Sequence, residues 1–449
     1  MSTPTQPLPP ATPIYILRGH AAAIHALQIF NQNLRLVSGD ADGWVVVWDL
    51  IFKRPVAAWK AHEGAVLEVK GFTLGGGRLT EIYTHGRDHK LRVWRFRAQD
   101  EEILQKTLPV NPSGQPTNSP QSQTQSQPWL IHSLPVNALN FCAFSILALG
   151  SNESPQQSDA GAEKSDEIPS STALIAVPNA LDSGATDLFH LPSERRICTI
   201  PTDPAVKTGM VMAAQLTQSP TSDDLYVAAA YEDGHVMVFA CRGVFQSNIP
   251  LTDAKRTWKW ERLYISTPHS QPVLSIDLAP SREYFLSSSA DAVLAKHPIP
   301  RFGRSNTRET PLKSVNTKHA GQQGIRVRSD GKVFATAGWD SRVRVYSCKT
   351  MKELAVLKWH KEGCYAVAFG NISSTATPAP ALDADDTSGT TTEEPQGEGG
   401  NNEEKEIIQR EGKEYSLAQV QRQRSLKVKN THWLVAGSKD GKISLWDIY

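Results

Sequence analysis

The chain has 449 residues, with 47 Lys and Arg against 46 Asp and Glu, so its formal net charge is +1. This balance argues against a protein that binds nucleic acid through bulk positive charge, because such proteins carry a clear basic excess. The length allows one large all-β domain or about three smaller domains of roughly 100–200 residues each. The five cysteines are far apart and form no C-x-x-C pair, so we expect reduced, buried thiols of an intracellular protein.

The N-terminal region predicts a short flexible tail followed by a strand. Residues 1–11 lack the basic and apolar regions of a secretory signal. Pro13–Leu17 (PIYIL) is apolar and β-prone. We expect no membrane span, because the longest weakly charged apolar stretch, Leu134–Gly150, is interrupted by Pro and Asn residues and is shorter than the ~20 residues of a spanning helix.

A tight turn that contains Asp, followed six residues later by an aromatic or apolar residue, recurs along the chain. The flanking segments are rich in Val, Ile and aromatic residues and are bounded by Asp-Gly-type turns, as β-hairpins are. Successive turns are 46 to 58 residues apart, except for two intervals of 94 and 100 residues that contain low-complexity insertions. The seven pairs are Asp42–Trp48, Asp88–Trp94, Asp182–Leu188, Asp233–Phe239, Asp291–His297, Asp340–Tyr346 and Asp440–Trp446.

The spacing is near or somewhat above the ~40–45 residues of a WD-type propeller blade. Seven anchors therefore predict an all-β fold, a seven-bladed WD-repeat β-propeller in one domain over residues 12–449. The chain stops at Tyr449, after the third strand of the last blade. We expect residues 13–17 to supply the missing outer strand and to close the ring, because pairing there removes an exposed sheet edge.

Three insertions are expected, at about 109–128, 150–171 and 371–429. Each has too little apolar surface to offset chain entropy, so we predict disordered loops. Strand order places the first on the face that carries the Asp turns and the other two on the opposite face. In the third insertion, a short helix over Lys405–Leu426 is expected between an acidic run, residues 383–398, and the basic residues. Charge patterning favours solvated loops for both runs. The basic residues are Arg422, Arg424, Lys427 and Lys429.

A His lies upstream of several turns, and in two of these cases a small residue precedes it. Two repeats end in Trp-Asp, at Trp48-Asp49 and Trp446-Asp447. The arrangement resembles the WD-repeat family, in which a Gly-His lies near the start of each repeat and Trp-Asp at its end. The resemblance implies that His, a Ser or Thr hydroxyl, the turn Asp and Trp form a buried chain of hydrogen bonds, which would fix strand register. In blade seven Ala436 stands where the hydroxyl is expected, so we expect a shorter network there. The network residues so predicted are His20, Ser38, Asp42 and Trp48 in blade one, His62, Thr84, Asp88 and Trp94 in blade two, His319, Thr336 and Asp340 in blade six, and His360, Asp440 and Trp446 in blade seven.

The recurring Ser, His and Asp invite a catalytic-triad interpretation, but they recur once per repeat beside Trp, which favours a structural network. His85 and His89 flank one turn and do not complete a tetrahedral metal site. Gly75–Gly77 lacks the Lys-Ser/Thr of a phosphate-binding loop. We therefore expect no enzyme, no cofactor and no metal. A deep pocket holding a titratable group outside the repeat network would favour the enzyme class.

A closed propeller without catalytic groups presents a rigid rim of loops, which suits protein binding. The residues before each turn Asp lie on one face, and four of them have the side chains expected of a partner-binding rim: Arg87, Glu232, Trp339 and Lys439. Aromatic and guanidinium groups are enriched in interface hot spots. For Trp339, packing against the neighbouring blade is an equal alternative, because Trp is commonly mostly buried.

Several longer segments are similar to one branch, the fungal ASTRA-associated WD-repeat proteins, themselves similar to animal Gβ-subunit-like proteins. These are PIYILRGHAAAIHAL, SGDADGWVVVWDL, GRDHKLRVW, GWDSRVRVY and LVAGSKDGKISLWDIY. The resemblance implies a subunit of the ASTRA complex that acts in chromatin regulation. It also implies work with the chaperones that mature phosphatidylinositol-3-kinase-related kinases, alongside the RuvB-like ATPases. Implied with it are a nuclear location with a cytoplasmic pool, no direct nucleic-acid or membrane contact, and a monomer within a hetero-complex.

A generic WD-repeat adaptor, such as a ubiquitin-ligase substrate receptor or a G-protein β-like subunit, is the alternative. A true Gβ usually has a long N-terminal coiled-coil helix, whereas only about a dozen Pro-rich residues precede the first strand here.

Overall fold

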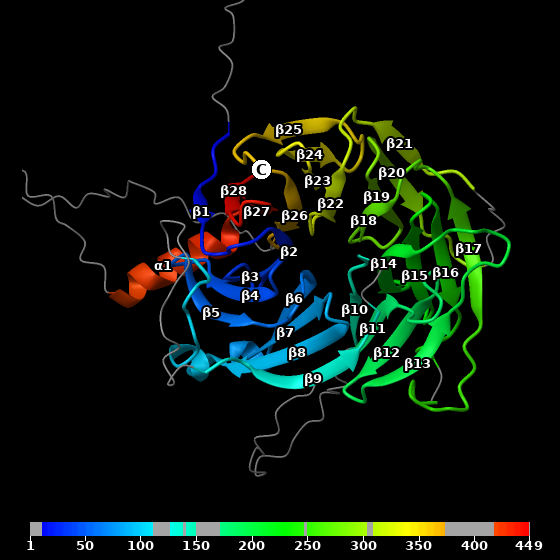
Figure 1. The fold of residues 1–449 in the computed structure, drawn as a ribbon, viewed down its shortest axis with the longest axis horizontal. Coiled ribbons are helices and arrows are strands. Elements are labelled where there is room, and N and C mark those ends of the chain that lie inside the picture. The colour runs from blue at the N-terminus through cyan, green and yellow to red at the C-terminus, as the bar shows by residue number, and fades with distance from the viewer. Residues whose placement is uncertain are drawn as a thin grey trace, which may run out of the picture.

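The computed structural model describes residues 11–110, 126–137, 141–149, 171–246, 249–302, 309–372 and 417–448. Its strands form seven four-stranded antiparallel sheets. Figure 1 shows the sheets as blades around a common axis, each with its innermost strand nearest that axis. The predicted seven-bladed β-propeller is therefore confirmed.

The first three blades follow the chain from the inside of the ring outward. Blade one contains β2 (Ile24–Phe30), β3 (Arg35–Asp40), β4 (Trp44–Asp49) and β5 (Arg54–Lys60). Blade two contains β6 (Val66–Leu74), β7 (Leu79–Gly86), β8 (Lys90–Arg97) and β9 (Trp129–Pro135), with short 3-10 turns at Gly75–Gly77 and Ala98–Glu102. Blade three contains β10 (Ser145–Leu149), β11 (Thr172–Pro178), β12 (Thr186–Leu191) and β13 (Arg195–Ile200).

The next three blades repeat the order. Blade four contains β14 (Val211–Gln218), β15 (Leu225–Tyr231), β16 (Val236–Cys241) and β17 (Trp260–Ser266). Blade five contains β18 (Val273–Leu278), β19 (Tyr284–Ser289), β20 (Val293–Pro298) and β21 (Lys313–Asn316). Blade six contains β22 (Gln322–Val327), β23 (Val333–Gly338), β24 (Val343–Ser347) and β25 (Glu353–Leu357).

Blade seven joins the two ends of the described chain. Its inner strands are β26 (Cys364–Phe369), β27 (Trp433–Ser438) and β28 (Ile443–Asp447), and its outer strand is β1 (Tyr15–Leu17). Tyr15 lies opposite Leu445, and Leu17 lies opposite Ile443. Leu17 is buried in a cluster that joins blade seven to blade one. The first strand thus closes the ring (Figure 1).

Six of the seven inner strands carry the same irregularity. Their register with the second strand shifts between the first and third residues, as at Ile24/Ala26 in blade one and Val66/Glu68 in blade two. Such bulges twist a strand and redirect one side chain. The skipped residues are His25, Leu67, Met212, Leu274, Gln323 and Tyr365.

Only the flanks of the first insertion, up to residue 110 and from residue 126, lie in the described part of the chain. The insertion connects the third and fourth strands of blade two, so the chain leaves β8 at the end opposite the Asp turn. The chain then crosses the outer edge of blade one, where the Ala58 amide donates to the Gln105 carbonyl. Further on, the Val110 amide donates to the carbonyl of Gly19, which precedes β2. Leu108 packs at Gly19. The placement predicted for residues 111–125 lies outside the described residues.

The helix of the third insertion ends later than expected. Helix α1 spans Leu417–Asn430, whereas residues 405–416 of the expected helix lie outside the described residues. The helix continues past Leu426 because Val428 is buried against the first blade, and Trp433 Nε1 donates to the Val428 carbonyl at 2.8 Å. Figure 1 shows α1 outside the ring beside β1. Among the described residues, no helix has the length and apolarity to cross a membrane.

Candidate functional site

The network of blade one is built on Asp40. His20 Nδ1 lies 2.7 Å from Asp40 Oδ2, and His20 Nε2 lies 2.7 Å from Ser38 Oγ, which also accepts from Trp48 Nε1 at 2.8 Å. Asp40 Oδ1 accepts from the Asp42 and Trp44 amides. The assignment of Asp42 to this network is wrong, because its side chain is exposed and makes no bond to His20.

The residue two positions before the turn Asp explains this difference. In blade two that position is Gly86, where an added Cβ would lie 2.3 Å from the His62 ring. A side chain at this position therefore points at the histidine. Blade one has Asp40 there, so its carboxylate reaches His20 first and Asp42 is left in solvent.

Blade two has the network that the sequence predicts, with one additional member. His62 contacts Asp88 Oδ1 at 2.8 Å and Thr84 Oγ1 at 2.7 Å, and Trp94 Nε1 donates to Thr84 Oγ1 at 3.1 Å. Arg92 Nη1 donates to Asp88 Oδ2 at 2.7 Å. Burial alone would raise the pKa of Asp88, but the bonds from His62 and Arg92 hold it below its ordinary value.

Blade six replaces the histidine with an arginine. Arg344 is buried and donates to both oxygens of Asp340, at 3.1 and 2.6 Å. His319 is 43% exposed, and its Nδ1 lies 3.8 Å from Asp340 Oδ2. The prediction of His319 as a buried network member is wrong, because Arg344 fills that place. Thr336 is buried on β23.

In blade seven, the hydroxyl of the network comes from a different strand than in blades one and two. Ser444 lies directly opposite Ala436, and its Oγ is 2.7 Å from His360 Nε2 and accepts from Trp446 Nε1 at 2.8 Å. Asp440 pairs with Lys442 Nζ at 2.7 Å. The network is therefore shorter at the carboxylate end and not, as predicted, at the hydroxyl.

Blade five contains a full network that the sequence analysis missed. His269 contacts Ser287 Oγ at 2.7 Å and Asp291 Oδ1 at 3.2 Å. His297 takes the place of Trp, with Nε2 2.8 Å from Ser287 Oγ and Nδ1 2.9 Å from Tyr264 Oη. Burial lowers the pKa of His297 to about 3. The available signal was His269, eighteen residues before Ser287, the separation of His20 from Ser38.

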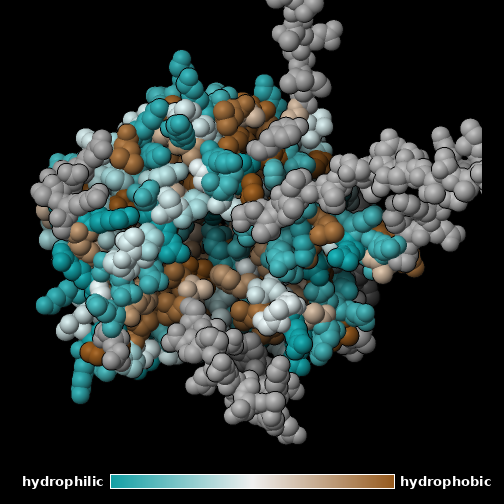
Figure 2. Space-filling view, turned by 180° about the vertical axis from the view of Figure 1, so that it is seen from behind, coloured by the Kyte–Doolittle hydropathy of each residue, from teal (hydrophilic) through white to brown (hydrophobic). Residues whose placement is uncertain are grey.

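The inner strands enclose a central cavity of about 420 Å³. All six bulged residues line it, joined in blade three by Phe141 and Ala143. Because the bulges lie where each inner strand begins, next to the Asp turns, they line the mouth of the cavity on that face. Figure 2 shows a hollow near the centre of the molecule, with hydrophobic side chains at its border.

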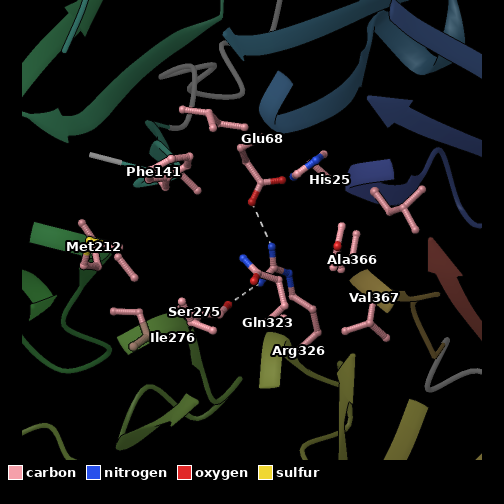
Figure 3. A pocket seen from close by; sticks show the side chains of 18 of the residues that line it. His25, Glu68, Phe141, Met212, Ser275, Ile276, Gln323, Arg326, Ala366 and Val367 are labelled. Atoms are coloured by element: carbon pink, nitrogen blue, oxygen red, sulfur yellow. Dashed lines mark hydrogen bonds and ion pairs between the residues drawn. The ribbon is translucent and has the colours of Figure 1, made fainter. Parts of the chain in front are cut away.

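Deeper in the cavity an ion cluster spans the ring. Arg326 of blade six donates to Glu68 of blade two at 2.9 Å and to Ser275 Oγ at 3.3 Å, as Figure 3 shows. Lys70 Nζ lies 3.6 Å from Glu68, and burial lowers the pKa of Lys70 and raises that of Asp277 nearby. These titratable groups lie outside the repeat networks, as an enzyme pocket requires, but the acidic and basic groups neutralise one another.

The rim residues share one backbone contact. The amide of each donates to the carbonyl just before the inner strand of the same blade, as Arg87 does to Ala65, Trp339 to Gly321 and Lys439 to Gly363. Glu232 donates likewise to Met210, but its carboxylate turns back to accept from the Met210 amide. The rim positions are thus equivalent and lie on the Asp-turn face, while their role in binding stays a prediction.

The side chains of the rim are well exposed. Trp339 is 48% exposed, and its Nε1 donates to Gln323 Oε1 at 2.9 Å, so it does not pack as a core residue. The Arg87 guanidinium lies 4.2 Å from the centre of the Phe141 ring, itself 58% exposed. Within the described residues, no three His, Cys, Asp or Glu side chains gather in a way that could hold a metal. The arrangement offers rigid aromatic and cationic groups around a central opening.

Comparison with known proteins adds an independent finding. The family model of ASTRA-associated protein 1 matches residues 13–446. The chain is 63% identical to ASTRA-associated protein 1 of Aspergillus niger over 443 residues, which is 98% of each chain. It is 36% identical to ASTRA-associated protein 1 of Schizosaccharomyces pombe over 379 residues, which is 80% of this chain and 93% of that protein.

Proposed function

The chain belongs to the family of ASTRA-associated protein 1, and from this premise we propose that it is a non-catalytic docking subunit of the ASTRA complex. Two relatives with this name cover nearly the whole chain or most of it. A propeller suits such a role, because rigid strands hold its loops in fixed positions and the loops contact partners.

The observation that carries the proposal is the Asp-turn face. Arg87, Trp339 and Lys439 occupy equivalent rim positions and project from a frame that backbone bonds hold in place. A preorganised surface loses little conformational entropy on binding. Trp and Arg are also the residue types that dominate interface hot spots.

The finer parts of the proposal follow the resemblance noted in the sequence. The chain would act in chromatin remodelling and in the chaperoning of phosphatidylinositol-3-kinase-related kinases, with the RuvB-like ATPases among its partners. It would act in the nucleus, with a cytoplasmic pool, as one copy in a hetero-complex. No direct contact with nucleic acid is expected, since the net charge is only +1.

Affinity purification of the tagged full-length chain from its native organism, followed by mass spectrometry, tests the proposal. ASTRA subunits and kinase-maturation chaperones should be recovered in near-stoichiometric amounts. Recovery of a ubiquitin-ligase core or of G-protein subunits in their place would overturn it and would support the adaptor alternative.

A further inference from the structure

One sector of the Asp-turn face concentrates exposed cations around Trp339. We call it the Trp339 crescent: Lys318, Trp339, Arg342, Lys361 and Lys439. Its parts are adjacent, because the Trp339 ring covers Gly321, three residues after Lys318, and an added Cβ at Gly363 would lie 3.1 Å from the Trp339 carbonyl. The Lys439 amide donates to the Gly363 carbonyl at 2.9 Å. The crescent is thus one continuous surface built by blades five to seven.

The charge of the crescent is not neutralised within the described part of the chain. None of its four cations has a salt bridge to another described residue, and three of them are exposed. The turn carboxylates beside them are already engaged, Asp340 by Arg344 and Asp440 by Lys442. Glu362 is the one exposed acid in the loop that carries Lys361. A ligand here meets a net positive field.

The crescent opens directly onto the mouth of the central cavity. Trp339 belongs to both, and Gln323, Tyr365, Leu274 and Met212 continue the lining around the mouth. The Trp339 ring is held by its bond to Gln323, so one ring face is presented without further ordering. Figure 3 shows that the floor below carries the Glu68–Arg326 pair, whose charges cancel. The mouth therefore favours a neutral, apolar side chain.

We propose that the Trp339 crescent and the cavity mouth bind an acidic linear segment of a partner protein, rich in Asp and Glu, with one large apolar side chain inserted into the mouth. The inference rests on the docking function proposed above and specifies the chemistry of the partner. Complementary charge would orient the segment and speed its capture, while the inserted side chain would supply most of the affinity.

The chain's own acidic run is a less favourable occupant. The third insertion leaves the described chain at Ile372 and returns at Leu417, between the inner strand β26 and the second strand β27. Those strand ends lie opposite the Asp turn of the same blade, which connects β27 to β28. The chain's own acidic run would have to reach from that end of the blade to the Asp-turn face, whereas a segment from a partner protein would not.

A phage-displayed library of random 12-residue peptides, panned against the full chain, tests the proposal. Enriched peptides should combine several Asp or Glu with one aromatic or large aliphatic residue. Synthetic copies should bind about thirtyfold more weakly to Trp339→Ala and about tenfold more weakly to Lys361→Glu/Lys439→Glu than to wild type. Added salt should weaken the binding of the peptides to the wild-type chain. A matched control, Arg195→Glu/Lys259→Glu on exposed outer positions, should bind as wild type.

Four outcomes of the peptide assay would overturn the proposal: no enrichment, peptides without acidic residues, equal affinity for the crescent variants, or binding only after residues 373–416 are deleted. The last of these would assign the surface to the chain's own acidic run. A labelled 20-nucleotide single strand is included, and tighter binding of it than of the peptides would assign the crescent to nucleic acid. Recovery of ASTRA subunits is measured separately, so a wrong partner chemistry is distinguishable from a wrong docking function.

Discussion

Asp40 fixes the turn of the first blade with one fully buried carboxylate. It joins His20 to the amides of Asp42 and Trp44, and Ser38 extends the chain of bonds to Trp48. Inside a protein such a network is strong when every member is satisfied, and the loss of one member leaves the others unsatisfied.

Asp40→Ala is therefore expected to destabilise the fold by about 1–3 kcal/mol for each donor left unpaired. Asp42→Ala, two residues away and exposed, is the matched control and should change stability by less than about 0.5 kcal/mol. Thermal unfolding followed by circular dichroism measures both. A larger loss of Tm in Asp42→Ala than in Asp40→Ala would contradict the assignment.

His297 makes stability depend on pH. Its pKa is about 3 in the folded chain against an ordinary value of 6.5, because burial disfavours the charged form. Between these values the unfolded chain binds a proton that the folded chain does not, so stability is full above pH 6.5 and falls as the pH drops. The loss is about 1.4 kcal/mol per pH unit for one such histidine.

His297→Gln should lower the stability at pH 7 but flatten its decline toward pH 5, because the new side chain does not titrate. Urea unfolding midpoints at pH 7, 6 and 5 measure the slopes of the two proteins. Burial also lowers the pKa of His25, His62, His85, His190 and His360, which titrate in both proteins and so contribute equally to the two slopes. Parallel slopes for wild type and variant would count against the role of His297.

The repeat spacing predicted where the hydrogen-bond networks lie but not every member. The six-residue spacing from Asp to an aromatic or apolar residue identified each turn, but in blade one it selected Asp42, whereas the carboxylate of the network belongs to Asp40, two residues earlier in the same turn. The choice depends on which Cβ points at the histidine. The position four residues after the turn Asp held further information, because it carries Arg92, Arg344 and Ser444, which all join the networks.

At the scale of elements, β1 connects the beginning of the chain to its end. It pairs with β28 over three residues and buries Leu17 between blades seven and one. Without it, β28 would present an unpaired edge, and such edges promote association.

Deletion of residues 1–17 should therefore lower Tm and produce dimers or aggregates, with a stability loss of about 2–5 kcal/mol from the Leu17 cavity alone. The chain lacking residues 1–11 keeps β1 and is the control. Size-exclusion chromatography and thermal unfolding compare the two. If both deletions behave alike, the ring does not depend on β1.

The strands were predictable because each alternates or runs apolar between turn residues, whereas the path of the first insertion was not. The approach of Leu108 to Gly19 and the bond from Ala58 to Gln105 join residues far apart in sequence, and no local pattern specifies them. Helix α1 ends where it does for the same reason, since Val428 is fixed by a tertiary contact.

At the scale of the whole molecule, the ring turns seven equivalent loops into one surface. Six bulged residues and the rim converge on the mouth of the central cavity, while the ion cluster from Glu68 to Arg326 ties opposite blades together beneath it. The described ends of the second and third insertions lie on the side opposite the Asp turns.

The most direct test is the recovery of ASTRA subunits by full-length chain carrying Arg87→Ala, Trp339→Ala and Lys439→Ala together, measured by quantitative mass spectrometry beside wild type and a chain lacking residues 371–400. The account predicts that the triple variant melts near the wild-type temperature and loses its partners, since a single hot-spot truncation costs about 2 kcal/mol or more. Partners that stay bound to the triple variant but are lost from the deletion would contradict it.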